Sequence, residues 1–212
     1  MQAKSDINPF YLIGYGGLAR EVLGWLTVEK HDLLHRFAGF LVTNDSRSDA
    51  LHHGYPVKHI DDITGGFSYL LTVSSPEAKE KIASQLSKRS DAKAESFVSS
   101  STLIGLNVQF GRGVIVNPRS SISSDATIGD FTLINCNNGI AHDVSIGHYC
   151  SVLGSASLNG NVIIGNKVTI GSGAIIHPGI KVGDGSIVGM GAVVFRNVQP
   201  GTTVIGNPAR KF

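Results

Sequence analysis

The feature that most constrains the fold is an apolar residue at every sixth position through the second half of the chain. The series runs without a break from Val98 to Val194, and every member but one is aliphatic. A small or β-branched residue follows four positions later in nearly every unit, and glycine often follows directly. Because strand side chains alternate between two faces, positions i and i+4 share a face. Each unit of six is therefore predicted to form a short strand and a corner.

The first half of the chain follows a different pattern. Buried strands are predicted at residues 10–13, 37–42 and 69–73, and helices at residues 18–26 and 76–86. Strands and helices in alternation indicate a small parallel α/β domain of the Rossmann type. A polar stretch, residues 87–96, separates the two patterns. We expect two domains, residues 1–92 and 93–212.

Charge and cysteine content argue against several classes of function. With 18 Lys and Arg against 16 Asp and Glu, the chain lacks the basic excess of a nucleic-acid or membrane-surface binder. It has no apolar signal core at its start and no run of about 18 apolar residues to cross a bilayer. Cys136 and Cys150 have no metal-site spacing, which favours a reducing compartment. We expect a soluble, cytoplasmic protein that binds small molecules, with neither nucleic acid nor membrane as a partner.

The six-residue repeat resembles that of the left-handed parallel β-helix acyltransferases. A sandwich of ordinary hairpins would instead place its turns at irregular spacings of roughly 8 to 12 residues. In the β-helix, three units form one triangular coil, so residues eighteen apart stack at the inter-strand spacing of about 4.8 Å. The resemblance implies a homotrimer, with active sites in the clefts between adjacent β-helices.

His142 and Asp143 stand out in a segment of glycine, serine and small aliphatic residues. The repeat places His142 at an outward corner with Gly160 one coil above it, which predicts an open notch beside the imidazole. An imidazole suits a general base at neutral pH, and an adjacent carboxylate raises its basicity and fixes its tautomer. His148 falls on a different face, so the two histidines cannot easily share a metal, and we expect no metal site. We interpret His142 and Asp143 as residues that the fold does not require; a surface histidine without a role is the alternative.

Four features together resemble the NeuD/PglD family of bacterial sugar acetyltransferases. They are the opening GYGGLAREV, the α/β first domain, the pair Ile134 and Asn135 seven residues before HD, and the closing VIGNPARKF. The resemblance covers nearly the whole chain. It implies that His142 takes a proton from the amino or hydroxyl group of a sugar as this group attacks acetyl-CoA. It also implies that Asp143 increases the basicity of His142 and that Asn135 contacts the substrate.

By the same resemblance, acetyl-CoA lies along outward residues of successive coils. The matching positions are Ser151, Gly160, Ser172 and Met190. A backbone N–H near Gly160 is the candidate donor to the oxyanion. The tail GNPAR suggests that Arg210 and Lys211 approach the phosphates of CoA. Neither cysteine is expected to act as a nucleophile, because Cys150 is predicted to point inward and Cys136 has no base partner, so transfer is expected to be direct.

The first domain is expected to hold the second substrate. Residues 14–19, GYGGLA, fit G-x-G-x-x-A between a strand and a helix, where backbone N–H groups favour a phosphate. The resemblance implies contacts from Gly16, Gly17 and Leu18, and from Ser74 after the third strand, to a nucleotide sugar. Leu18 stands where relatives often carry histidine, so the identity of the nucleotide is left open.

Taken together, the sequence predicts an acetyl-CoA-dependent N-acetyltransferase that acts on a nucleotide-linked amino sugar for bacterial surface glycan synthesis. The same base can activate a hydroxyl group, so a sugar O-acetyltransferase of the sialic-acid type is an alternative. An alternative of another class is a non-catalytic β-helix that binds a ligand or scaffolds a complex.

Overall fold

The structure is a computed structural model that describes residues 8–43 and 48–212. The chain divides into two compact units: Met1–Val73 with Lys81–Glu95, and Ser74–Glu80 with Ser96–Phe212. Helix α2 (Pro76–Leu86) begins in the second unit and ends in the first. Among the described residues, no helix is long and apolar enough to span a bilayer.

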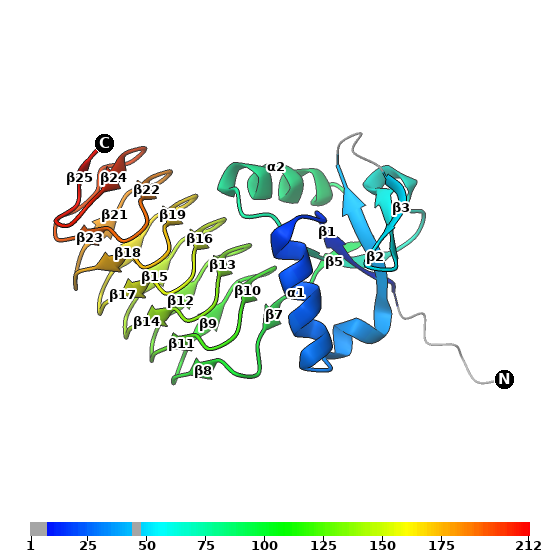
Figure 1. The fold of residues 1–212 in the computed structure, drawn as a ribbon, viewed down its shortest axis with the longest axis horizontal. Coiled ribbons are helices and arrows are strands. Elements are labelled where there is room, and N and C mark those ends of the chain that lie inside the picture. The colour runs from blue at the N-terminus through cyan, green and yellow to red at the C-terminus, as the bar shows by residue number, and fades with distance from the viewer. Residues whose placement is uncertain (1–7, 44–47) are drawn as a thin grey trace. The chain divides into compact units, whose positions relative to one another are not determined.

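The first unit is built on a six-stranded sheet with the strand order β3-β4-β2-β1-β5-β6 (Figure 1). Its strands are β1 (Phe10–Ile13), β2 (Phe37–Val42), β3 (Ser48–His52), β4 (Tyr55–His59), β5 (Phe67–Leu71) and β6 (Ala92–Ala94). Its helices are α1 (Gly17–Val28), part of α2, and the 3-10 turns η1 (Asp32–Arg36) and η2 (Ile60–Asp62). All strand pairs are parallel except β3 with β4, so the predicted parallel α/β unit is confirmed.

The predicted elements of this unit are present with small shifts. Strands β1 and β2 have the predicted bounds, and so does α2. Helix α1 is longer than predicted by one residue at its start and two at its end, and β5 begins and ends two residues earlier than predicted. The hairpin β3–β4 and strand β6 were not predicted from the sequence.

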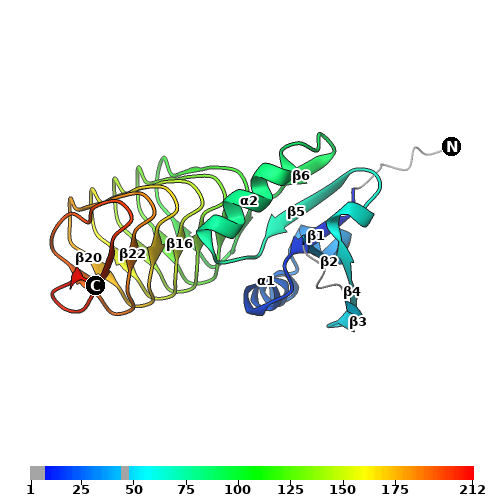
Figure 2. The ribbon, with the colours of Figure 1, turned by 90° about the horizontal axis from the view of Figure 1, so that it is seen from above.

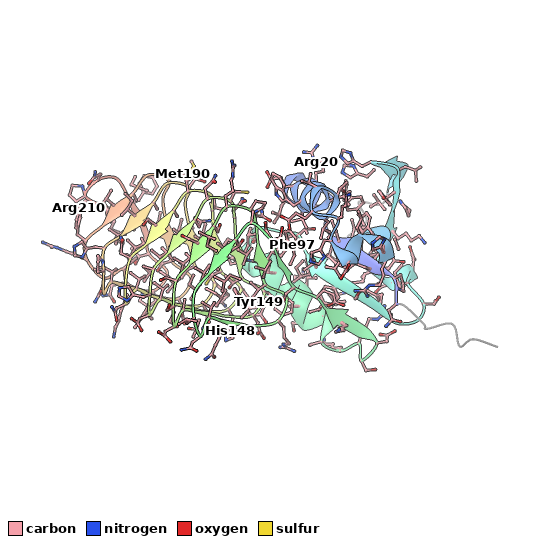
Figure 3. The ribbon with its side chains drawn as sticks, turned by 90° about the horizontal axis from the view of Figure 1, so that it is seen from below. Arg20, Phe97, His148, Tyr149, Met190 and Arg210 are labelled. Carbon is pink, nitrogen blue, oxygen red and sulfur yellow. The ribbon has the colours of Figure 1, made fainter. Side chains whose placement is uncertain are left out.

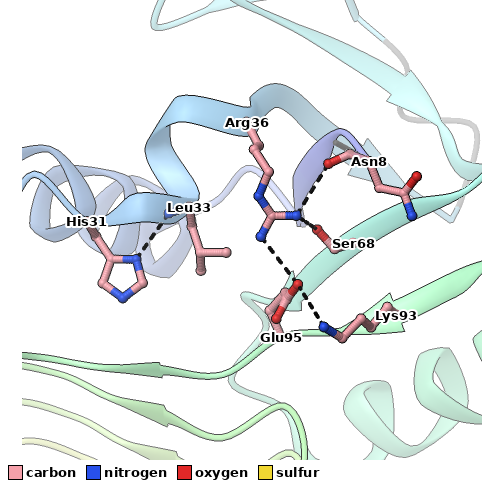
Figure 4. A network of polar contacts seen from close by, with 7 residues as sticks. All are labelled: Asn8, His31, Leu33, Arg36, Ser68, Lys93 and Glu95. Atoms are coloured by element: carbon pink, nitrogen blue, oxygen red, sulfur yellow. Dashed lines mark hydrogen bonds and ion pairs between the residues drawn. The ribbon is translucent and has the colours of Figure 1, made fainter. Parts of the chain in front are cut away.

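The guanidinium of Arg36 joins three parts of the first unit (Figure 4). It donates to the Ser68 hydroxyl at 3.1 Å, to the Asn8 carbonyl at 3.3 Å and to the Glu95 carboxylate at 3.3 Å. Lys93 lies 3.6 Å from the same carboxylate. These contacts tie the segment that follows β6 to β5 and to η1.

The second unit is a β-helix whose short strands form three faces and pair in parallel, except that the final strand β25 is antiparallel to β24 (Figure 1). The first face consists of β7 (Phe97–Val98), β10 (Ile115–Val116), β13 (Leu133–Ile134), β16 (Ser151–Val152), β19 (Thr169–Ile170), β22 (Ile187–Val188), β24 (Thr203–Ile205) and β25 (Arg210–Lys211). The second face consists of β8 (Leu103–Ile104), β11 (Ser121–Ile122), β14 (Gly139–Ile140), β17 (Ser157–Leu158), β20 (Ile175–Ile176) and β23 (Val193–Val194). The third face consists of β9 (Gln109–Phe110), β12 (Thr127–Ile128), β15 (Ser145–Ile146), β18 (Ile163–Ile164) and β21 (Lys181–Val182).

The predicted eighteen-residue stacking is confirmed. Ile140 pairs with Leu158 in the next coil, and the coils repeat this register as far as Val194 (Figure 2). The last coil is two residues shorter, because Val182 pairs with Val198 and Ile187 with Thr203. The predicted aliphatic positions from Val116 to Val194 are buried and form one continuous core. Each such side chain contributes about 1.5–3 kcal/mol through burial. Ile104, in the first coil, is an exception with 49% exposure, because its strand β8 is the end strand of its face among the described residues.

Three kinds of corner connect the faces, and each recurs every eighteen residues. We name them by one member: the Asn135 corner (135–138) between the first and second faces, the His142 corner (141–144) between the second and third, and the His148 corner (147–150) between the third and first. The third residue of most corners has a positive φ, as at Asp143 (59°) and Asn161 (62°). Asparagine, aspartate and glycine adopt this conformation most readily.

Candidate active site

The imidazole of His142 is held by the residue that follows it. Its Nδ1 lies 2.8 Å from Oδ2 of Asp143, and both side chains are more than half exposed, at 61% and 53%. Because a carboxylate only accepts hydrogen bonds, Nδ1 carries the proton and Nε2 holds the lone pair. The pair therefore presents a base at Nε2, where a ligand in solvent can reach it.

Gly160 lies one coil above His142, as the stacking rule predicts. A Cβ added to Gly160 would lie 2.7 Å from Cε1 and 2.8 Å from Nε2 of the imidazole. The predicted open notch is therefore wrong, because the imidazole itself fills that space. Glycine is required here so that the ring can lie against the backbone. The Gly160 N–H makes no hydrogen bond within the described part of the chain.

Asp143 also has a structural reason to be where it is. Its φ of 59° matches that of Asp125 and Asn161, which occupy the same position one coil below and one coil above. Aspartate is one of the few residues that this conformation favours. The interpretation that the fold does not require Asp143 is thus too simple, whereas His142 has no comparable backbone requirement.

Asn135 lies at a different corner from His142. The strand β14 separates them, so the two residues stand at opposite ends of the second face of one chain. The amide oxygen Oδ1 of Asn135 accepts hydrogen bonds from the Cys136 N–H at 2.7 Å and from Nδ2 of Asn117 at 3.0 Å. One copy of the chain therefore does not bring Asn135 and His142 together.

The four positions predicted for the cofactor are also divided. Gly160 belongs to the His142 corner, whereas Ser172 and Met190 stack above Cys136 at the Asn135 corner. Met190 is 78% exposed and points out from one edge of the β-helix, while His148 points out from the other (Figure 3). The backbone N–H groups of Ser172 and Met190 have no partner among the described residues.

Ser151 is on the first face and is completely buried. Its hydroxyl donates to the Ser74 carbonyl at 2.7 Å and accepts from Nζ of Lys79 at 2.8 Å. Nζ of Lys79 also donates to the Cys150 carbonyl at 2.6 Å. Burial lowers the pKa of Lys79 to about 7. This contact could not be predicted from the sequence, because Lys79 lies in a charged helix and its partner is 72 residues away.

At the His148 corner, the polar groups make hydrogen bonds within the chain. Nδ1 of His148 accepts from the Asp130 N–H at 2.9 Å, and the His148 N–H donates to the Asn166 side chain at 2.8 Å. Cys150 points inward, as predicted, and burial raises the pKa of its thiol to about 11. Among the described residues no group of three potential ligands could hold a metal ion.

In the first unit, the glycine loop leads directly into α1. Gly14 has a φ of 97°, which favours glycine, whereas a Cβ on Gly16 or Gly17 would meet nothing within 4 Å. The first turn of α1 contains no acidic residue, and Gly16 provides no side-chain cap. Leu18 is half-buried, and Ser74 belongs by its contacts to the second unit. The space at Gly16 and Gly17 and the uncapped N–H groups suit an anion.

The C-terminal end of the β-helix contains a cavity of about 340 Å³. Its floor is apolar, and its lining includes the cations Arg196, Arg210 and Lys211 but no acidic residue. Arg210 and Lys211 are exposed. Arg196 follows β23, at the corner between the second and third faces, three coils above the His142 corner.

Comparison with known proteins gives one family match and several structural likenesses. Residues 161–196 match the family described as bacterial transferase hexapeptide (six repeats). Comparison with curated protein sequences gives no match. WeeI from Acinetobacter baumannii AYE is 31% identical with a TM-score of 0.86, and the likeness covers 96% of this chain and 99% of that chain.

Two further solved structures have the same fold and contain ligands. PerB from Caulobacter crescentus, in complex with CoA and GDP-perosamine, is 24% identical with a TM-score of 0.85, covering 97% of this chain and 98% of that chain. The acetyltransferase domain of PglB from Neisseria gonorrhoeae FA1090, in complex with acetyl coenzyme A, is 20% identical with a TM-score of 0.72, covering 97% and 99%. The shared fold therefore includes both units of the chain.

Proposed function

The chain belongs to the NeuD/PglD-like family of hexapeptide-repeat sugar acetyltransferases, and on this basis we propose that it transfers an acetyl group from acetyl-CoA to the amino group of a nucleotide-linked sugar. The observation that carries the proposal is the His142–Asp143 pair, which leaves Nε2 of His142 as an accessible base. The ligands CoA and GDP-perosamine in PerB support both proposed substrates. We infer that the enzyme acts in the cytoplasm, because both proposed substrates are cytoplasmic metabolites. We also propose a role in surface glycan synthesis, which the family resemblance implies.

The proposed reaction is a direct transfer. The sugar nitrogen forms a bond to the carbonyl carbon of the thioester while Nε2 of His142 takes the amine proton. Asp143 stabilises the imidazolium through Nδ1. The Gly160 N–H, which has no partner within the described residues, is suited to stabilise the negative charge that develops on the carbonyl oxygen. The C–S bond then breaks, and the proton passes from His142 to the departing thiolate.

We propose that the remaining predicted residues bind the two substrates. Ser172 and Met190 would contact acetyl-CoA through their backbone N–H groups, and Arg210 and Lys211 would lie near its phosphates. Ser151 would have to act indirectly, through the contact that it makes with Lys79. Gly16, Gly17, Leu18 and Ser74 would contact the nucleotide-linked part of the acceptor.

A homotrimer fits this assignment. Asn135 and His142 lie at different corners of one β-helix, so a cleft that contains both needs one corner from each of two copies. A cyclic trimer has such heterologous interfaces, in which different patches of adjacent copies meet.

The test is an assay of the purified protein with acetyl-CoA and a panel of nucleotide-linked amino sugars and their hydroxyl analogues. CoA release gives the rate, and product mass and linkage show whether nitrogen or oxygen is acetylated. We expect N-acetylation, and a turnover about two to four orders of magnitude lower in His142→Ala. His148→Ala is the matched control, because this histidine is exposed at another corner. Near wild-type turnover in His142→Ala with a confirmed acceptor would contradict the mechanism.

A further inference from the structure

Two asparagines stacked at the Asn135 corner fix the direction of one exposed amide. Oδ1 of Asn135 already accepts two hydrogen bonds, from the Cys136 N–H at 2.7 Å and from Nδ2 of Asn117 at 3.0 Å. A backbone N–H can only donate, so the amide of Asn135 cannot turn around without losing the first bond. Asn117 must in turn present its nitrogen, because two amide oxygens would repel each other.

This arrangement leaves one donor available to ligands. Nδ2 of Asn135 has no hydrogen-bond partner in the described part of the chain, and the side chain is partly exposed. Nδ2 of Asn135 is also not buried, because it does not belong to the buried side-chain atoms without a partner that the described residues contain. Asn135 therefore offers two N–H bonds and no acceptor.

Asn117 is placed at a cost to stability. Its side chain is completely buried, and its Oδ1 has no partner within the described residues. An unpaired buried amide oxygen destabilises a fold. The same position in higher coils is occupied by Leu153, Gly171 and Gly189, so the β-helix does not require asparagine there.

The backbone beneath Asn135 is fixed as well. The Asn135 carbonyl accepts from Nδ2 of Asn138 at 2.6 Å and from the Ser120 hydroxyl at 3.0 Å. Above this corner the inward position of Asn138 is taken by alanine, at Ala156 and Ala174. Polar side chains thus hold both the backbone and the amide of Asn135 in one orientation.

We propose that Asn135 binds an oxygen atom of the acceptor sugar as a donor only, and that Asn117 is the positioning residue that sets this polarity. The inference rests on the proposed function, because it takes Asn135 as a contact to the acceptor. The reacting nitrogen is not the partner of Asn135: a hydrogen bond donated to the amine lone pair would hold the electrons that must attack the thioester. Asn135 thus recognises the sugar ring or a hydroxyl group beside the amine.

The substitution Asn135→Asp separates donor from acceptor roles at nearly constant shape. Its inner oxygen can still accept from Cys136 and Asn117, but its outer oxygen no longer donates. We expect the KM for the acceptor sugar to rise about tenfold or more, with the KM for acetyl-CoA unchanged. Unchanged or improved use of the acceptor would overturn the donor assignment, since an acceptor role would survive this change.

Asn117→Leu tests the positioning role. It introduces the residue that Leu153 provides at the same position two coils above. We expect the thermal unfolding midpoint to stay equal or rise, because the unpaired oxygen is removed, while the KM for the acceptor rises about three- to tenfold. The matched control is Asn107→Gly, which removes a cross-coil bond of equal length, 3.0 Å to Asp125, and tolerates the positive φ. A loss of activity in Asn117→Leu that is accompanied by an equal loss in the control would overturn the proposal.

A readout without catalysis separates this inference from the proposed function. In ¹⁵N spectra of the unliganded wild-type protein, assigned with the two variants, the side-chain NH₂ of Asn117 should exchange slowly with solvent and that of Asn135 rapidly. The reverse order would overturn the proposed polarity. If the exchange order is as expected but no sugar in the panel is acetylated, the proposed function fails while the orientation of the amides stands.

Discussion

At the scale of single residues, Asp143 satisfies a backbone requirement and holds an imidazole at the same time. Its positive φ is shared by the equivalent residues in neighbouring coils, but its carboxylate alone contacts a histidine ring. These two roles can be separated, because asparagine also adopts a positive φ readily.

We expect Asp143→Asn to lower kcat by about ten- to a hundredfold while leaving the unfolding midpoint unchanged. The amide oxygen can still accept from Nδ1, so the orientation of the ring survives, but the negative charge that stabilises the imidazolium is lost. Steady-state kinetics and thermal unfolding measure the two effects. Asp125→Asn, at the same position one coil below, should leave kcat unaffected; a kcat for Asp143→Asn equal to that of this control would exclude a role for the charge.

Gly160 gives a second prediction at this scale. In Gly160→Ala the backbone is tolerated, because the φ of Gly160 lies outside the left-handed region, but the new methyl group would lie 2.7 Å from the ring of His142. The imidazole must move, and we expect kcat to fall by about tenfold or more. Gly139→Ala is the control, since its added carbon would meet nothing nearer than 4.0 Å. Full activity in Gly160→Ala would show that the ring position is not critical.

At the scale of elements, the sequence predicted the strands and helices whose residues follow a repeat or a periodic pattern. The six-residue pattern predicted the β-helix because each coil repeats the same burial, and it located Gly160 above His142. The hairpin β3–β4 could not be predicted in the same way, because β4 contains Pro56 and Lys58 and its pairing depends on the neighbouring strand β2. The orientation of the Asn135 amide was likewise hidden, since it depends on hydrogen bonds between coils.

The start of α2 gives a prediction that depends on pH. Burial lowers the pKa of Lys79 from 10.5 to about 7. Between about pH 7 and pH 10.5 the unfolded chain keeps this proton while the folded chain has lost it, so stability rises with pH through this window. Relative to Lys79→Met, the wild-type unfolding midpoint should therefore increase from pH 7 to pH 10.

Thermal unfolding of both proteins across this range measures the difference. Lys81→Met, which changes an exposed lysine of the same helix, should follow the pH dependence of the wild type. A constant difference between wild type and Lys79→Met at all pH values would contradict the lowered pKa.

At the scale of the whole molecule, the division of the site between two corners can be tested by mixing subunits. If each site takes His142 from one copy and Asn135 from the next, His142→Ala and Asn135→Asp trimers should each be impaired. In a cyclic trimer that contains both variants, one of the three interfaces combines two intact corners, so purified mixed trimers, formed by co-expression, should recover about a third of the wild-type turnover.

Differently tagged subunits allow the mixed trimers to be purified, and a mixture of separately assembled trimers is the control. Recovery of no activity beyond that control would place both residues in a site built from a single copy, and would remove the geometric support for the trimer.

The eighteen-residue register, which holds as far as Val194, also determines how such a chain can change its length. Gain or loss of eighteen residues adds or removes one complete coil, so everything beyond it shifts along the axis by about 4.8 Å and keeps its direction. A change of six residues would instead move every later side chain to the next face. Between β14 and β23, insertions and deletions in relatives should therefore come in whole coils, so the distance from His142 to the cationic C-terminal cavity should change in steps of one coil.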